Sequence, residues 1–151
     1  MTFKVEEARL VHLVEDGLEP LMHAHWKECS IDQDEVPLDP DWVMASAMEN
    51  CDILHCFGLY RKAKLVGYSV FEVSTHLHFK STKFAYNSGI YVVPEHRGFA
   101  GVVLAARTEE LLKRMGVKKI VYSVPPGSAM GAVLGKLGFG LSESYYTKLT
   151  G

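Results

Sequence analysis

The chain has 151 residues, of which 48% are hydrophobic and 23% are charged, and its formal net charge is -2 at pH 7. This composition is typical of a globular protein with its own core, which excludes a disordered tract and favours a single domain over residues 1–151. Because so small a net charge creates no basic field, we expect neither nucleic acid nor a membrane surface as a partner.

The start of the chain and the cysteines indicate the compartment. Residues 1–10 mix charged and apolar side chains, and no apolar run of about 18 residues occurs, so we expect neither export nor a membrane span. The three cysteines, Cys29, Cys51 and Cys56, are odd in number, far apart in the sequence and without the spacing of metal ligands. We therefore expect reduced thiols that pack in the interior of a cytoplasmic protein, and no metal site.

The first part of the chain predicts one strand and two helices. Residues 3–9 alternate as a strand does, and a helix begins within 15–20 and ends near Cys29. An acidic, proline-containing loop follows over 30–41, and a short helix leads from Asp39 to Asn50.

The rest of the chain is richer in strands. The pattern predicts a hairpin over 53–73, a third strand over 84–93, a helix over 102–115, a strand over 117–124, a short helix over 128–138 and a last strand over 139–149. This order of elements is typical of an α/β (mixed α+β) fold, in which helices cover a mixed sheet.

Residues 91–104 lead from a strand into a helix through a corner with one arginine and two glycines. Free N–H groups at a helix start favour anions, and Arg97 adds a permanent positive charge. Gly98 and Gly101 would allow close approach of a bulky ligand. The corner is therefore a candidate phosphate site. A plain turn is the alternative, because neither the P-loop nor the dinucleotide glycine pattern is present.

The segment VPEHRGFAGVVL resembles the acyl-coenzyme A loop of the GCN5-related N-acetyltransferase (GNAT) family, in which Arg or Gln is followed by two variable residues, Gly, one variable residue and Gly or Ala. The strand KKIVYSV, the segment LGKLGF at 134–139 and the order of elements extend the resemblance. The segments HLHFK and YYTK are also similar to small phage-type members. The resemblance implies a mostly antiparallel central sheet with helices on both faces.

Four positions depart from the family pattern. Ala100 stands at the loop glycine, and Val102 at the position of Gly or Ala. Leu134 replaces a tyrosine that many members use as general acid, and Gly127 replaces an asparagine that often contacts the cofactor arm.

The resemblance implies an acetyl-CoA-dependent N-acetyltransferase, in which a primary amine attacks the thioester directly. Acetyl-CoA would be the co-substrate, with its diphosphate on the loop N–H groups and its pantetheine arm along the preceding strand. The residues implied to bind it are Tyr91, Val92, Val93, Arg97, Gly98, Phe99, Ala100, Gly101 and Val102.

Acid and base candidates come from three regions. Tyr145 and Tyr146 alternate on the expected last strand, so that one of them would face the thioester sulfur, unless both only pack. His76 and His78 would share one strand face. As a pair they could act as a base, bind zinc together with His25, or be ordinary polar residues of the edge. The resemblance puts Glu28 at the acceptor wall, where a solvated surface charge is the alternative.

The acidic residues of 28–41 favour a cationic acceptor, either a small-molecule amine or a protein amine. A homodimer is compatible with the resemblance. Two other functions stay open: a catalytically weak or inactive binding protein on the same fold that acts through a protein partner, and a purely structural domain whose glycines only make a turn.

Overall fold

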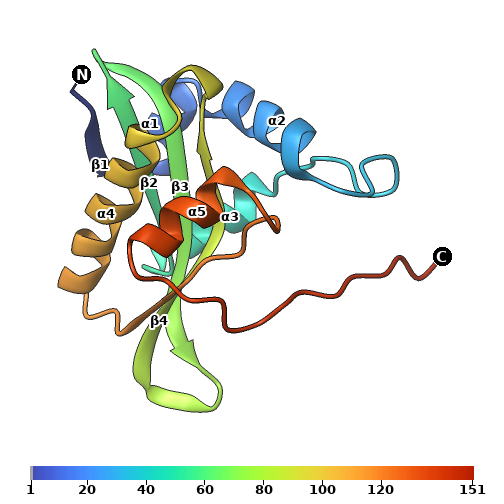
Figure 1. Cartoon of the computed structure of the whole chain (residues 1–151). Coiled ribbons are helices and arrows are strands. Elements are labelled where there is room, and N and C mark those ends of the chain that lie inside the picture. The colour runs from blue at the N-terminus through green and yellow to red at the C-terminus, as the bar shows by residue number, and fades with distance from the viewer. Residues whose placement is uncertain (1) are drawn as a thin grey trace.

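The computed structural model describes residues 2–151 and shows a five-stranded sheet with helices on both faces (Figure 1). The elements in chain order are β1 Lys4–Ala8, α1 Leu10–Glu15, α2 Leu18–Cys29, α3 Trp42–Asn50, β2 Leu54–Arg61, β3 Lys64–His76, β4 Phe79–Val92, the 3₁₀ turn η1 Pro94–His96, α4 Phe99–Arg114, β5 Lys119–Val121 and α5 Ala129–Lys136. The strands lie in the order β1-β2-β3-β4-β5; neighbouring strands are antiparallel except β4 and β5, which are parallel. The expected mixed, mostly antiparallel sheet is confirmed.

Two apolar layers cover the sheet because successive strand residues point to opposite faces. On one face Phe57 of β2 packs with Phe71 of β3 and with Leu104 of α4. On the other face Cys56 lies among apolar residues of α1, α2 and α3, including Leu13 and Leu18. The central strands are thus buried on both sides, which accounts for their nearly continuous apolar sequence.

One element is added and two expected elements differ in the structure. The helix expected to begin within 15–20 and to end near Cys29 is present as α2, but the sequence reasoning missed the short helix α1 before it, from which α2 is separated at Gly17 with its positive φ of 106°. The strand expected over 117–124 is paired only over Lys119–Val121. The prediction of a strand over 139–149 is wrong, because this segment has no strand partner among residues 2–151.

The expectation that all three cysteines are buried is also wrong for two of them. Cys29 ends α2 and Cys51 follows α3, so both lie at exposed helix ends. Cys56 is buried in the centre of β2, and burial raises its pKa to about 12. This thiol is therefore protonated and unreactive at neutral pH.

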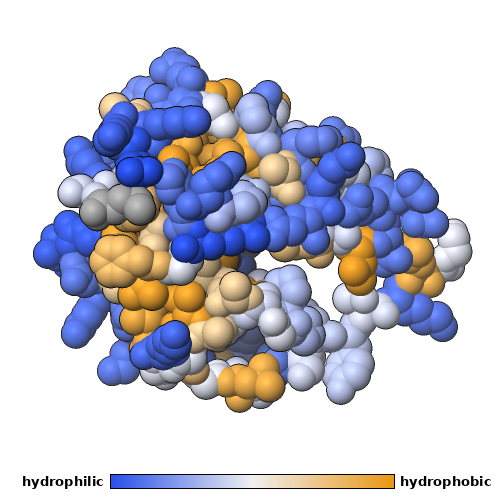
Figure 2. Space-filling model, turned by 45° about the horizontal axis from the view of Figure 1, so that its top comes forward, coloured by the Kyte–Doolittle hydropathy of each residue, from blue (hydrophilic) through white to orange (hydrophobic). Residues whose placement is uncertain are grey.

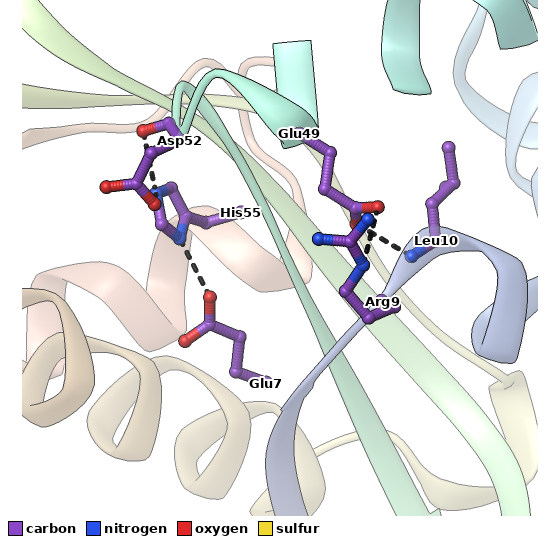
Figure 3. A network of polar contacts seen from close by, with 6 residues as sticks. All are labelled: Glu7, Arg9, Leu10, Glu49, Asp52 and His55. Atoms are coloured by element: carbon purple, nitrogen blue, oxygen red, sulfur yellow. Dashed lines mark hydrogen bonds and ion pairs between the residues drawn. The ribbon is translucent and has the colours of Figure 1, made fainter. Parts of the chain in front are cut away.

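Polar contacts tie the carboxyl-terminal end of α3 to the junction of β1 and α1 (Figure 3). Glu49 accepts a hydrogen bond of 2.7 Å from the Leu10 backbone N–H and forms a 3.2 Å ion pair with Arg9. Nearby, the buried His55 lies 2.8 Å from the carboxylate of Glu7. These contacts hold α3 over the sheet, where it forms one wall of a cavity described below.

Thr108 of α4 offers a test of core packing. Its side chain is fully buried, and its hydroxyl has no hydrogen-bond partner among the described residues. Since an unpaired buried hydroxyl costs about 1–3 kcal/mol, we expect Thr108→Val to raise the free energy of unfolding by about 1 kcal/mol or more. Urea denaturation measures the change, with Thr108→Ser, which keeps the hydroxyl, as the control. A less stable valine variant would contradict this view of the core.

Among residues 2–151, no helix combines the length and the apolar character needed to cross a bilayer.

Candidate functional site

The sheet opens between β4 and β5. These strands pair only where Phe84–Tyr86 lie beside Lys119–Val121, although β4 continues to Val92. On its β5 side, the edge of β4 beyond Tyr86 therefore keeps N–H and C=O groups that no other strand within residues 2–151 uses. An extended ligand can add to such an edge as a further strand would.

A β-bulge lies at the start of this open edge. Val70 of β3 pairs with Gly89, whereas Phe71 pairs with Asn87, so that Ser88 is the extra residue. The Asn87 amide nitrogen fixes the bulge by donating to Ser69 Oγ, Val70 O and Gly89 O at 3.0–3.2 Å. The Asn87 Oδ1 atom is buried and has no partner among residues 2–151. An unpaired buried acceptor beside an open edge suggests a place for a ligand N–H group.

The far end of the open edge is the corner that the sequence singles out. Gly98 has φ 97° and ψ −107°, a backbone conformation that favours glycine, and it is the N-cap of α4. The N–H groups of Phe99 and Ala100 lie in the first turn of α4 and have no acceptor within the helix. Figure 2 looks toward this end of the molecule and shows hydrophobic surface beside an indentation with a hydrophilic rim.

Gly101 has a different role from Gly98. It is buried, and a Cβ atom there would lie 3.4 Å from Met130 Cε and 3.8 Å from Val133 Cγ2, both on α5. Ala100 is fully buried in the core. Both positions therefore face the interior, where a methyl group at 101 would make ordinary van der Waals contact with α5. The expected close approach of a ligand at Gly101 finds no support in this geometry.

Arg97 is held by three groups. Its Nε–H donates to Val92 O at 2.9 Å, its two terminal nitrogens each donate to one carboxylate oxygen of Glu28 at 2.6 Å, and its guanidinium lies 5.4 Å from the centroid of the Tyr91 ring. These hydrogen bonds hold the pKa of Glu28 below its ordinary value. Glu28, an expected catalytic residue, is therefore a weak base that fastens the end of α2 to the corner.

A cavity of about 390 Å³ lies between the helices α2 and α3 and the sheet face that is turned away from α4. Its walls are mainly apolar and include Met22, Trp26, Trp42 and Met48. A few polar groups interrupt them, among which His25, Tyr68, Glu72 and Ser88 come from α2, β3 and the bulge of β4. An apolar cavity with a few convergent polar groups is typical of a small-molecule site.

His25 lies where this cavity meets the bulge. Its Nδ1 atom is 2.7 Å from the Tyr68 hydroxyl, and its ring stacks on Tyr91 with centroids 5.1 Å apart. The imidazole lies over Gly89, where a Cβ atom would be in ordinary van der Waals contact with it, 3.6 Å from Cε1. Burial lowers the pKa of His25 below 6.5, which keeps the imidazole neutral at pH 7. A neutral imidazole is able to accept a proton.

The other expected catalytic residues lie elsewhere. His78 is exposed in the turn between β3 and β4, and the sequence distance from Tyr68 to His76 along β3 corresponds to about 26 Å at 3.3 Å per residue. His25 therefore does not meet His76 and His78. Tyr145 and Tyr146 lie in an exposed segment after α5. The expected cofactor residues, in contrast, are together on the end of β4 and the corner.

Sequence reasoning missed three residues of this site. Tyr68 and Asn87 look like ordinary strand residues, and His25 was considered only as a zinc ligand. The local signal for this site in the sequence is Gly89, because a glycine inside an expected strand indicates a bulge or a close approach of the backbone. Its meaning depends on His25, which is 64 positions earlier in the chain (89 − 25).

Comparisons with known proteins agree with this architecture. The model of the acetyltransferase (GNAT) family matches residues 18–139. No curated protein matches the chain. Among solved structures, an aminoglycoside acetyltransferase from an uncultured soil metagenomic sample is 15% identical, with a TM-score of 0.75 and complete coverage of both chains. Glucosamine-6-phosphate N-acetyltransferase from Arabidopsis thaliana is 13% identical, with a TM-score of 0.72 and complete coverage of both chains.

A third similar structure is that of AAC(6')-Iy in complex with the bisubstrate analogue CoA-S-monomethyl-acetylneamine. It is 19% identical, has a TM-score of 0.64, and 99% of each chain is covered. At these identities the three structures show that the fold is shared, and the acceptor must be argued from this chain's own cavity.

Proposed function

Since this chain belongs to the acetyltransferase (GNAT) family, a family of N-acetyltransferase enzymes, we propose that it uses acetyl-CoA to acetylate a cationic primary amine. The observation that carries the proposal is the meeting of two features at the bulge of β4. An open strand edge leads to it from the corner at Gly98, and an apolar cavity with a neutral histidine reaches it from the other face.

The residues present fit acetyl-CoA. The N–H groups of Gly98 and Phe99, at the exposed start of α4, would hold the diphosphate. The free edge of β4 would hold the amide-containing pantetheine arm, and the unpaired Asn87 Oδ1 offers an acceptor to one of its N–H groups. Arg97 is engaged by Glu28, so we expect its main role to be holding the corner in place, with its positive charge as a secondary attraction.

We assign the general base to His25. With its proton on Nδ1, the imidazole donates to the Tyr68 hydroxyl, and Nε2 keeps a free lone pair. In the reaction the amine nitrogen forms a bond to the thioester carbonyl carbon, the carbon–sulfur bond breaks, and His25 takes the proton that the amine loses. The thiolate of CoA leaves and takes a proton from solvent or from a nearby hydroxyl.

The cavity favours a cationic acceptor with an apolar part. Tyr68, Val70 and Glu72 follow one another at every second position of β3 and line the same cavity, which places a carboxylate four residues along β3 from the Tyr68 that contacts His25. The exposed acidic loop at 30–41 borders α2 and α3 and adds negative charge. An amine with a second positive charge would be attracted by both.

Calorimetry and a thiol-release assay test this function. We expect wild-type protein to bind acetyl-CoA and CoA at micromolar concentrations, and to release thiol faster with diamines or aminoglycosides than with amino acids of similar size. Glu72→Gln should raise KM for the cationic acceptors and leave the affinity for acetyl-CoA unchanged. Absence of cofactor binding would overturn the proposal.

Acetyl-CoA binding without thiol release would support the alternative of a catalytically weak binding protein. The specific observation that favours it is Leu134, which is buried in the core at the position where many members have a tyrosine that acts as general acid.

A further inference from the structure

The half of α2 that carries His25 has little apolar anchoring. Within this helix Leu18 alone is buried, and it is the first residue of α2. After Cys29 the chain passes into the exposed loop 30–41, which stands out from the body of the molecule in Figure 1. Full burial therefore anchors only the start of α2, and the position of His25 depends on the contacts around the other end.

One paired polar contact joins this end of α2 to the corner. Glu28 accepts a hydrogen bond of 2.6 Å from each terminal nitrogen of Arg97, and the Arg97 Nε–H donates to Val92 O at 2.9 Å. Two parallel bonds between a guanidinium and a carboxylate fix direction as well as distance. Since Val92 ends β4, Arg97 links the end of α2 to the strand that carries the bulge.

Glu28 lies one helical turn after His25. Residues three positions apart are neighbours on a helix surface, so the two side chains lie on the same side of α2. Tyr91 completes the arrangement, because its buried ring stacks on His25 and lies 5.4 Å from the Arg97 guanidinium. The base, the carboxylate, the arginine and the tyrosine thus form a closed circuit.

We propose that the ion pair of Arg97 and Glu28 positions the imidazole of His25 over the bulge of β4. Both are then positioning residues of the reaction. The inference rests on the proposed function, in which His25 is the general base. Without the pair, the end of α2 is free to move off the strand together with His25, and a displacement of about 1 Å can lower a rate 10²-fold.

Glu28→Ala tests this positioning. We expect kcat for thiol release to fall about ten- to a hundredfold. The affinity for acetyl-CoA, measured by calorimetry, should not fall, because Arg97 keeps its bond to Val92 and its charge is freed for the diphosphate. The urea midpoint should hardly change, since a partly exposed ion pair adds little to stability. Glu28→Ala combined with Arg97→Ala should lower kcat no more than Arg97→Ala alone, because the two residues act as one unit.

The pKa of His25 is a second readout, which needs no acetyl transfer. Burial is the largest cause that lowers this pKa, and the charge of Glu28 raises it. Removing that charge alone would lower the pKa further, whereas a ring released into solvent would titrate closer to 6.5. In Glu28→Ala we therefore expect the pKa of His25 to rise. Magnetic resonance of the free protein measures it, with His25→Gln to assign the signal.

Other titratable groups around the ring are unchanged in this variant. They are Tyr68 and Glu72 of β3, Tyr91 of β4, Asp41 at the start of α3 and Arg97 at the corner.

Glu110→Ala is the matched control. It breaks the 2.6 Å ion pair with Arg107, which lies within α4 and joins no two elements. This variant should keep the kcat and the His25 titration of the wild type. If the wild type is active and Glu28→Ala keeps its kcat, or if the pKa of His25 falls or stays, this inference is overturned and the proposed function stands. A wild type that releases no thiol with any amine would overturn both.

Discussion

His25→Gln should lower kcat by about 10²- to 10⁴-fold, the range that a positioned general base contributes. Glutamine approximates the size and polarity of the imidazole but accepts no proton near neutral pH. The imidazole lies beside the bulge of β4 and lines the acceptor cavity, whereas the free N–H groups of the corner are at the other end of the open edge. We therefore expect the affinity for acetyl-CoA, measured by calorimetry, to stay unchanged.

The pH dependence of kcat distinguishes a base from a structural residue. His25 must be neutral to accept a proton, and burial lowers its pKa below 6.5. In the wild type, kcat should therefore rise with pH as His25 loses its proton and level off below pH 6.5, apart from any titration of the acceptor amine itself. His25→Gln should lack this rising limb. Tyr68→Phe removes the 2.7 Å contact that orients the ring and should lower kcat by a smaller factor.

The chain offers a matched control for this experiment on the same helix. His23 is exposed and two positions from His25, with its ring centroid 5.9 Å from that of Trp26. His23→Gln should leave both kcat and its pH profile as in the wild type. If His25→Gln kept most of the activity and kcat still rose with pH as in the wild type, the base would have to be another group, and the assignment of His25 would be wrong.

Gly98→Ala should weaken the binding of acetyl-CoA by at least about tenfold, or 1.4 kcal/mol. The backbone at Gly98, with φ 97° and ψ −107°, is one that alanine adopts only at a cost of about 1–3 kcal/mol. Relaxing that strain turns the peptide that leads into α4, and with it the N–H groups proposed to hold the diphosphate. No atom lies within 4 Å of the added Cβ, so a steric clash plays no part in this effect.

Gly135→Ala is the control for Gly98→Ala. Gly135 also has open space around its Cβ position, but it lies in α5 with an ordinary helical backbone. Alanine there should raise the free energy of unfolding by about 0.5–1 kcal/mol and leave binding unchanged. Calorimetry with acetyl-CoA and urea denaturation on both variants separate the two effects. Equal affinities of Gly98→Ala and the wild type would place the diphosphate elsewhere.

The local elements were predictable because they depend on neighbours in the sequence. The apolar spacing from Leu104 to Leu111 and the stop at Gly116 predicted the helix that the structure has as α4. Gly98 was identified at the corner before α4, and its backbone conformation agrees with a residue that needs freedom in φ. The order of strands and helices was enough for the fold class.

The roles of individual side chains were less predictable, because they depend on what lies opposite. Gly98 and Gly101 were both expected to let a ligand approach the backbone, yet Gly101 is buried and faces α5. Arg97 was expected to attract phosphate, and its guanidinium is instead bound by Glu28, 69 positions away. Both outcomes follow from contacts between distant segments that no local pattern records.

The sequence by itself determined the elements up to α5 apart from α1 and the length of β5, the corner with its glycine, and the family resemblance, since each depends on local periodicity or on a short motif. Only the tertiary structure decided that His25 of α2 meets Tyr68 and the bulge at Gly89, because this depends on the register of β3 and β4 and on how α2 packs over them. The segment 139–149 shows the same division. Its alternating pattern is local, but a strand exists only when a neighbouring strand satisfies its hydrogen bonds, and none among residues 2–151 pairs with this segment.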